Sequence, residues 1–195
     1  MTRRSTVGLL ACLLAAGTAL AGCSEEQEAN TSLPSSSAAE PTEEELPPLG
    51  PEDLPMPEEA RTQDAEGAEA FVRYYFDLLN KSLADMDPQY LRLFAEAGCD
   101  VCERIASETE SDAAAGYSYA GGELTIPGNI SVKLNPPDEA ETAFVADQAP
   151  MTVLDSAGAP VPDLVFEGID ALNSGTITIW DDAESTWRLT ELTLG

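Results

Sequence analysis

The stretch AEGAEAFVRYYFDLLNKSLA, residues 65–84, decides how this chain folds. Its large apolar side chains recur at steps of three and four residues, and most of the charged side chains lie between them. This spacing is typical of an α-helix with one apolar face. The apolar positions are Phe71, Val72, Tyr75, Phe76, Leu79 and Leu83. We therefore expect a long helix over residues 65–84, which must bury that face against another layer of structure.

Two shorter helices are expected after it. Asp87 precedes Pro88 as an N-cap residue precedes a proline at the first helical position, which predicts a helix over residues 88–97 that stops at Gly98. A third helix is expected over residues 99–115 and ends at a further glycine. Its few large apolar side chains predict a place at the edge of the fold.

The remainder of the chain is typical of β-structure. Groups of Pro, Gly, Asn and Asp separate the strand-like runs 117–126, 130–134, 142–154, 175–180 and 186–194. Residues 176–179 alternate Thr and Ile, as in a strand with one buried face. The acidic turn 181–185 predicts a hairpin, and Gly121 and Gly122 predict a bend in the first run. Helices followed by strands predict an α+β fold with helices on one face of an antiparallel sheet.

The N-terminus has the pattern of a lipoprotein signal peptide. Two arginines are followed by the apolar residues 7–21, which are too short to span a bilayer comfortably. The last two of these residues begin the sequence Leu20-Ala21-Gly22-Cys23. That ending resembles a bacterial lipobox, which implies cleavage before Cys23 and acylation of that residue. We expect residues 1–22 to be a signal peptide and Cys23 to anchor the chain to the extracytoplasmic face of the cell membrane. The alternative is an ordinary secretory signal with a chance cysteine.

Residues 23–64 have the composition of an acidic, proline-rich linker. They hold seven of the 14 prolines and 12 acidic residues against one base, Arg61. Such a segment buries too little apolar surface to offset the entropy lost on ordering. We expect a disordered spacer and an α+β domain over residues 65–195 that folds without it. The alternative is a docking tail for a cationic partner.

The composition excludes several classes of function. The net charge is −27, which leaves no basic surface for a nucleic-acid partner. The chain has no histidine, so Ser-His-Asp and Cys-His nucleophile systems and histidine-built metal sites are absent. Paired carboxylates in a chain this acidic are expected by chance. We expect no cofactor, no metal and no catalytic residue.

The motif Cys99-Asp100-Val101-Cys102 carries the clearest chemical content. At a helix start the Cα atoms of such a pair lie about 5–5.5 Å apart, within disulfide range. Our interpretation is a structural disulfide. A thiol–disulfide oxidoreductase is the alternative, but a helix and a glycine precede the motif where a strand is typical of that class. Acidic neighbours also oppose a thiolate. A zinc site would need a second pair of ligands.

Two segments resemble an uncharacterised actinobacterial lipoprotein family, a domain of unknown function. They are GAEAFVRYYFDLLN, residues 67–80, and GCDVC, residues 98–102. Three helices followed by a sheet also resemble the cystatin-like and nuclear-transport-factor-2-like α+β cone. The resemblance implies helices packed on a curved antiparallel sheet and a location in the cell envelope. Enzymes on that scaffold generally rely on a histidine, which this chain lacks.

Aromatic residues are the candidates for a pocket between helix and sheet. They are Tyr74, Tyr75, Tyr117, Trp180 and Trp187. Cone folds of this kind often hold a small apolar ligand there; the alternative is that these rings fill the core. We therefore expect a non-catalytic, membrane-anchored envelope lipoprotein that binds a ligand or another envelope protein. The alternative function is an enzyme on the same cone that uses carboxylate and tyrosine chemistry.

Overall fold

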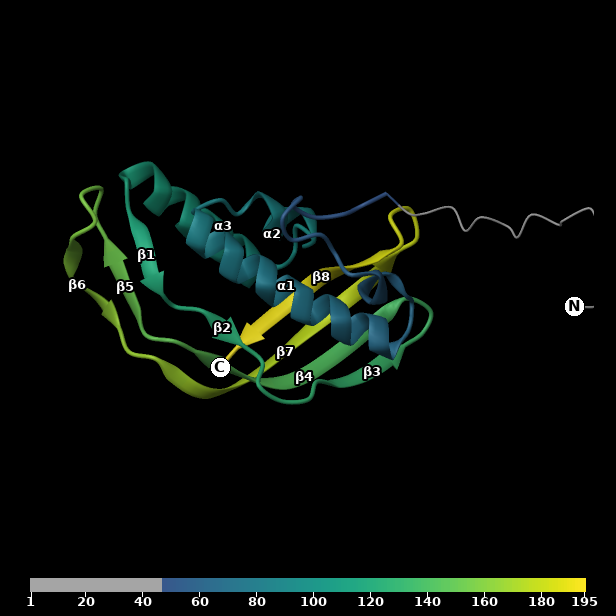
Figure 1. Ribbon diagram of the computed structural model, residues 1–195. Coiled ribbons are helices and arrows are strands. Elements are labelled where there is room, and N and C mark those ends of the chain that lie inside the picture. Colours follow the sequence, from purple (N-terminus) through teal and green to yellow (C-terminus); the bar gives the residue numbers. More distant parts are fainter. Residues whose placement is uncertain (1–46) are drawn as a thin grey trace, which may run out of the picture. The chain divides into compact units, whose positions relative to one another are not determined.

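The computed structural model describes residues 47–195 (Figure 1). Helices lie on one face of a curved layer of antiparallel strands, so the fold is α+β as the order of elements predicts. The helical elements are the 3-10 helix η1 (Glu58–Arg61), α1 (Ala65–Asp85), α2 (Gln89–Leu93) and α3 (Asp100–Ala115). The strands are β1 (Ser118–Gly121), β2 (Leu124–Thr125), β3 (Ser131–Asn135), β4 (Glu139–Gln148), β5 (Met151–Leu154), β6 (Pro160–Phe166), β7 (Ile169–Asp181) and β8 (Thr186–Leu194).

The long helix α1 confirms the helix expected over residues 65–84. The carboxylate of Asp64 caps its first turn by accepting a 2.7 Å hydrogen bond from the backbone N–H of Gly67. Met86 ends it in the left-handed conformation, with φ 56°. Its apolar face is buried against the sheet, and Phe71 and Val72 are fully buried. This face forms one side of the core.

The second helix is shorter than expected because the chain after it pairs with the sheet. Helix α2 ends at Leu93, whereas the sequence predicts a helix to residue 97. The backbone N–H of Glu96 donates to the carbonyl of Leu189 in β8 at 2.7 Å, and the N–H of Leu189 donates to the carbonyl of Phe94 at 2.9 Å. These bonds need extended backbone, which a continuing helix would not supply. Helix α3 ends at Ala115, and Gly116 caps it, as expected.

The strands form two antiparallel sheets. One has the order β2-β4-β7-β8, with β3 beside β2 on the same edge of β4, and the other has the order β1-β5-β6. Two expected runs are each divided between the sheets. The first divides at Gly121 and Gly122, which have φ of 79° and 90°, and the second divides at Ala149 and Pro150. The β7–β8 hairpin is confirmed, whereas β6, which begins at Pro160 and contains a second proline, was not expected.

Strand β7 turns its threonines, rather than its isoleucines, toward the helices. Thr176 and Thr178 are buried, while Ile177 is half-buried on the opposite face. The hydroxyls of Thr176 and Thr142, on the neighbouring strand β4, are hydrogen-bonded to each other at 2.7 Å. This bond satisfies polar groups that would otherwise be costly to bury.

The N-terminal strap, residues 47–64, corrects the expected start of the domain at residue 65. Met56 and Ala60 are buried in the same core as α1. The Arg61 guanidinium donates to the backbone carbonyl of Glu184, in the β7–β8 turn, at 2.8 Å. Sequence periodicity missed these contacts because the strap contributes isolated apolar residues instead of a repeating face. Their burial on α1 and β8 offsets the entropy of ordering this segment.

Candidate functional site

A cavity of about 300 Å³ lies between the helices α1 and α3 and residues of six strands, β1, β2, β4, β5, β7 and β8. Most of its wall is apolar. The apolar lining residues are Leu79, Leu83, Ile105, Leu124, Met151, Ile169, Leu172 and Leu194. A cavity of this size stands at the lower end of the range of small-molecule sites, which are typically apolar with a few polar groups. The arrangement is therefore suited to a small apolar ligand.

The bend between β1 and β2 helps to shape one side of this cavity. Gly121 and Gly122 have positive φ, which places Tyr119 of β1 and Leu124 of β2 on the same cavity wall. A Cβ on Gly122 would lie 2.9 Å from the Met151 sulfur, so the absence of a side chain there lets β5 approach closely. The glycine pair thus positions three lining residues.

Four polar side chains at the cavity come from α3 and β1. Thr109 is buried, and its hydroxyl donates to the carbonyl of Ile105 at 2.8 Å. The Arg104 guanidinium lies 3.5 Å from the Glu108 carboxylate, one helical turn away. Tyr119, on β1, is the fourth of these side chains. A polar side chain from β4, that of Gln148, also lines the cavity.

The phenol of Tyr119 donates a 2.5 Å hydrogen bond to the carboxylate of Asp112. Desolvation, together with this carboxylate, raises the pKa of Tyr119 above its ordinary value of 10. The phenol is therefore protonated at neutral pH and serves as a hydrogen-bond donor. A tyrosine in this state is poorly suited to act as a general base.

The five aromatic residues that were candidates for a pocket lining lie outside this cavity, and three of them follow the alternative, in which these rings fill the core. Tyr74, Tyr75 and Trp187 are buried in the core, while Tyr117 and Trp180 are half-buried outside the cavity lining. The two tryptophan rings pack edge to face, with centroids 5.3 Å apart, near the β7–β8 turn. The cavity instead lies near the opposite ends of these two strands.

Hydrogen bonds explain why two of these tyrosines fill the core. The Tyr74 hydroxyl donates to the carbonyl of Leu54 in the strap at 3.1 Å, and the Tyr75 hydroxyl donates to the carbonyl of Leu91 in α2 at 3.4 Å. Burial raises the pKa of both phenols. Each ring therefore joins α1 to a neighbouring segment. The sequence contained one indication of the cavity that the structure shows, because Leu79 and Leu83 lie on the apolar face of the expected helix and both line the cavity.

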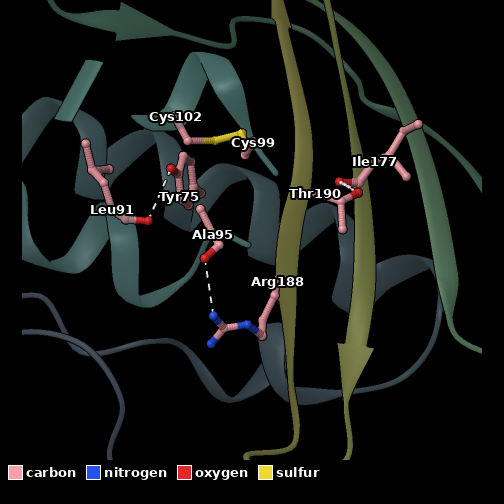
Figure 2. Close-up of a disulfide and its surroundings, with 8 residues drawn as sticks. All are labelled: Tyr75, Leu91, Ala95, Cys99, Cys102, Ile177, Arg188 and Thr190. Atoms are coloured by element: carbon pink, nitrogen blue, oxygen red, sulfur yellow. Dashed lines mark hydrogen bonds between the residues drawn. A yellow bond between two sulfur atoms is a disulfide. The ribbon is translucent and has the colours of Figure 1, made fainter. Parts of the chain in front are cut away.

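Cys99 and Cys102 are joined by a disulfide at the start of α3 (Figure 2). Their Cα atoms are 5.3 Å apart, as the spacing at a helix start predicts. Both side chains are buried. A buried disulfide offers little access to a partner thiol, so this geometry fits a structural role.

The disulfide adjoins a segment that is bound to the edge of β8. The Arg188 guanidinium donates to the carbonyl of Ala95 at 3.2 Å (Figure 2). It also donates to the carbonyl of Leu93 at 2.8 Å. It also forms a 2.5 Å ion pair with the Glu96 carboxylate. The loop between α2 and α3 thus covers β8, an edge strand that would otherwise present free backbone groups.

Two further properties bear on the site. Within residues 47–195, no group of three or more His, Cys, Asp or Glu side chains could hold a metal ion. Among the helices of that same segment, none is long and apolar enough to cross a membrane. The proposed signal peptide and Cys23 lie outside the described residues.

The chain belongs to a family of unknown function, DUF6318, whose profile matches residues 51–191. The match begins within the N-terminal strap. No curated protein matches the chain.

Several solved structures are similar to this chain at low sequence identity. The intermembrane space region of the chloroplast protein ARC6 is 15% identical, with a TM-score of 0.49, over 68% of this chain and 97% of that one. A nuclear transport factor 2-like superfamily protein from Salmonella enterica is 8% identical, with a TM-score of 0.46, over 68% and 92%. A cystatin-like protein of unknown function from Nostoc punctiforme is 12% identical, with a TM-score of 0.36, over 66% and 89%.

Proposed function

We propose that the domain is a non-catalytic binding module that holds a small apolar ligand in the cavity between α1, α3 and the sheet. The observation that carries this proposal is the cavity itself, about 300 Å³ in volume and lined by eight apolar side chains. Transfer of apolar ligand surface from water into such a site is favourable at roughly 25 cal/mol per Å². Leu79 of α1 and Leu172 of β7 are among the side chains that supply this surface.

The titratable groups of the described chain favour binding over catalysis. Catalysis near neutral pH generally uses a group that titrates there, and the chain has no histidine. The pKa of Tyr119, the tyrosine at the cavity, is raised. Burial also raises the pKa of the Asp77 carboxyl, but Asp77 lies on the exposed side of α1, outside the cavity lining.

We further propose that acylated Cys23 anchors this module to the outer face of the cell membrane. The signal-peptide pattern and the Leu20-Ala21-Gly22-Cys23 sequence support this part of the proposal. Acyl chains on one cysteine, two or more in number, are sufficient for stable anchoring. Residues 24–46 would connect the anchor to the strap.

Binding of decanol, a neutral apolar probe, to the chain of residues 23–195 carrying Cys23→Ala tests the cavity. Isothermal titration calorimetry should detect binding, and Ile169→Asp should weaken it, because Ile169 lines the cavity. Ile169 is 47% exposed, so the substitution should leave the fold intact.

Val165→Asp is the matched control. Val165 is an apolar residue in β6, the strand that precedes β7 in the chain, and it is 60% exposed and outside the cavity lining, so decanol affinity should be unchanged. No decanol binding by the unsubstituted chain, or equal losses in the two variants, would contradict the proposed site.

A further inference from the structure

Arg104 differs from every other cationic side chain in residues 47–195. Six of the seven Lys and Arg side chains there donate hydrogen bonds to carboxylates or backbone carbonyls. These are Arg61, Arg73, Lys81, Arg92, Lys133 and Arg188. The Arg104 guanidinium makes no hydrogen bond with the described residues, and its one ion pair is the 3.5 Å contact with Glu108. In so acidic a chain, a guanidinium with so few partners is unusual.

This guanidinium lies at the apolar cavity. Arg104 is a lining residue, and Ile105 and Thr109, on the same helix, form the adjoining wall. Its side chain is 59% exposed, so it lies at the cavity rim and its N–H groups remain accessible. A rim cation beside an apolar wall matches a ligand with an anionic head and a hydrocarbon chain.

We infer that the cavity takes a single-chain amphiphile with a carboxylate head, whose chain lies in the cavity and whose head binds Arg104. This inference rests on the proposed function, because it assigns a ligand class to the same cavity. A guanidinium presents a planar fork of N–H donors that matches a carboxylate through two parallel hydrogen bonds. Such a pair is more directional than the existing contact with Glu108.

Two effects oppose the binding of a carboxylate at Arg104. Glu108 is 63% exposed and competes for Arg104, but only through a single 3.5 Å contact. The net charge of −27 repels an anion at long range, yet this repulsion is screened beyond about 8 Å at physiological salt. The direct contact at the rim therefore outweighs the distant charges. Removal of the Glu108 carboxylate should strengthen carboxylate binding.

Calorimetric titration with decanoate, decanol and decylammonium tests this inference on residues 23–195 carrying Cys23→Ala. Arg104→Gln should weaken decanoate binding about tenfold, the equivalent of one charge-assisted hydrogen bond, and should change decanol binding less than about twofold. Glu108→Gln should strengthen decanoate binding. Lys133→Gln is the control, because it removes one positive charge from β3, outside the cavity lining.

The outcomes separate the two proposals. Decanol binding without an effect of Arg104→Gln on decanoate would overturn the carboxylate inference and leave the proposed function standing. Decylammonium that binds more tightly than decanoate would overturn it in the same way. If decanol and decanoate both fail to bind, the proposed function and the inference are both wrong. Equal losses in Arg104→Gln and Lys133→Gln would assign the effect to net charge and overturn the role of Arg104.

Discussion

The indole N–H of Trp187 donates a 2.9 Å hydrogen bond to the backbone carbonyl of Thr62, which lies 125 residues earlier in the chain. This bond joins the start of β8 to the N-terminal strap. Met56 of the strap is buried close to the same strand, where its sulfur accepts a 3.1 Å hydrogen bond from the Thr186 hydroxyl. The strap is therefore an integral part of the domain, although its composition is that of a linker.

Removal of residues 47–64 should destabilise the domain by about 3 kcal/mol or more. The estimate combines the lost burial of Met56 with the cost of leaving the Trp187 N–H without a partner. Urea denaturation of chains that begin at residues 47 and 65 measures the difference. Met56→Ala within the longer chain should cost about 2–5 kcal/mol, whereas Glu58→Ala, at an exposed strap position, should cost little. Equal midpoints for the two chains would contradict the role of the strap.

Replacement of both Cys99 and Cys102 by alanine should lower the free energy of unfolding by about 2 kcal/mol. The chain-entropy account gives this size for a loop as short as that of the pair. Urea denaturation provides the measurement, with the oxidised parent chain as the reference. In the folded parent chain, an alkylating reagent should find no reactive thiol at these positions. Rapid alkylation there would instead support redox chemistry.

The ion pair between Arg92 and Glu103 should make the free energy of unfolding depend on pH between about pH 2 and pH 4.5. Hydrogen bonds from Arg92, at 2.9 Å and 3.0 Å, and from Ser107 lower the pKa of Glu103 from 4.5 to about 2. Because the folded-state pKa is lower than the unfolded one, the contribution is present above about pH 4.5 and is lost as the pH falls toward 2.

The stability advantage of the parent chain over Glu103→Gln should therefore be larger at pH 6 than at pH 2. Thermal unfolding across that range provides the measurement. Glu66→Gln is the control, because Glu66 is exposed at the start of α1 and forms no ion pair within residues 47–195. A difference that does not change with pH would exclude this ion pair as its source.

Gly121→Ala should destabilise the fold more than Gly158→Ala. The two glycines have nearly the same positive φ, 79° and 78°, so both substitutions strain the backbone equally. A Cβ at position 121 would meet the carbonyl oxygen of Pro150, whereas a Cβ at position 158 has nothing within 4 Å. The difference between the two losses in free energy of unfolding, measured by urea denaturation, gives the cost of this contact. Equal costs would show that the Pro150 carbonyl can move away without penalty.

Cys23→Ala should release the protein from the membrane fraction. Under the proposed anchoring, the acyl chains on Cys23 hold the chain at the membrane. Immunoblots of membrane and soluble fractions after a high-salt wash measure the distribution. Ser24→Ala, at the next residue, should keep the protein in the membrane fraction. Retention of Cys23→Ala after the wash would contradict the anchoring proposal.

Local sequence determined the elements whose signals lie within a few residues. The apolar positions of α1 recur with the helical period, Asp64 caps its first turn, and β8 has the predicted bounds, residues 186–194. Gly116, the stop expected for α3, takes a positive φ. These signals can be recognised in the sequence because helix periodicity, capping and turn formation depend on neighbouring residues in the chain.

Tertiary structure alone decided what depends on distant partners. Thr176 faces inward because Thr142 lies opposite it and pairs with its hydroxyl, and alternation by itself leaves either face open. The strap is ordered because α1 and β8 bury its isolated apolar residues. The cavity lies between α1, α3 and the sheet, rather than among the candidate aromatic rings. Tyr74 and Tyr75 are instead held in the core, where their hydroxyls donate to the backbone carbonyls of Leu54 and Leu91. Each outcome is a free-energy balance between segments far apart in sequence, which no local pattern encodes.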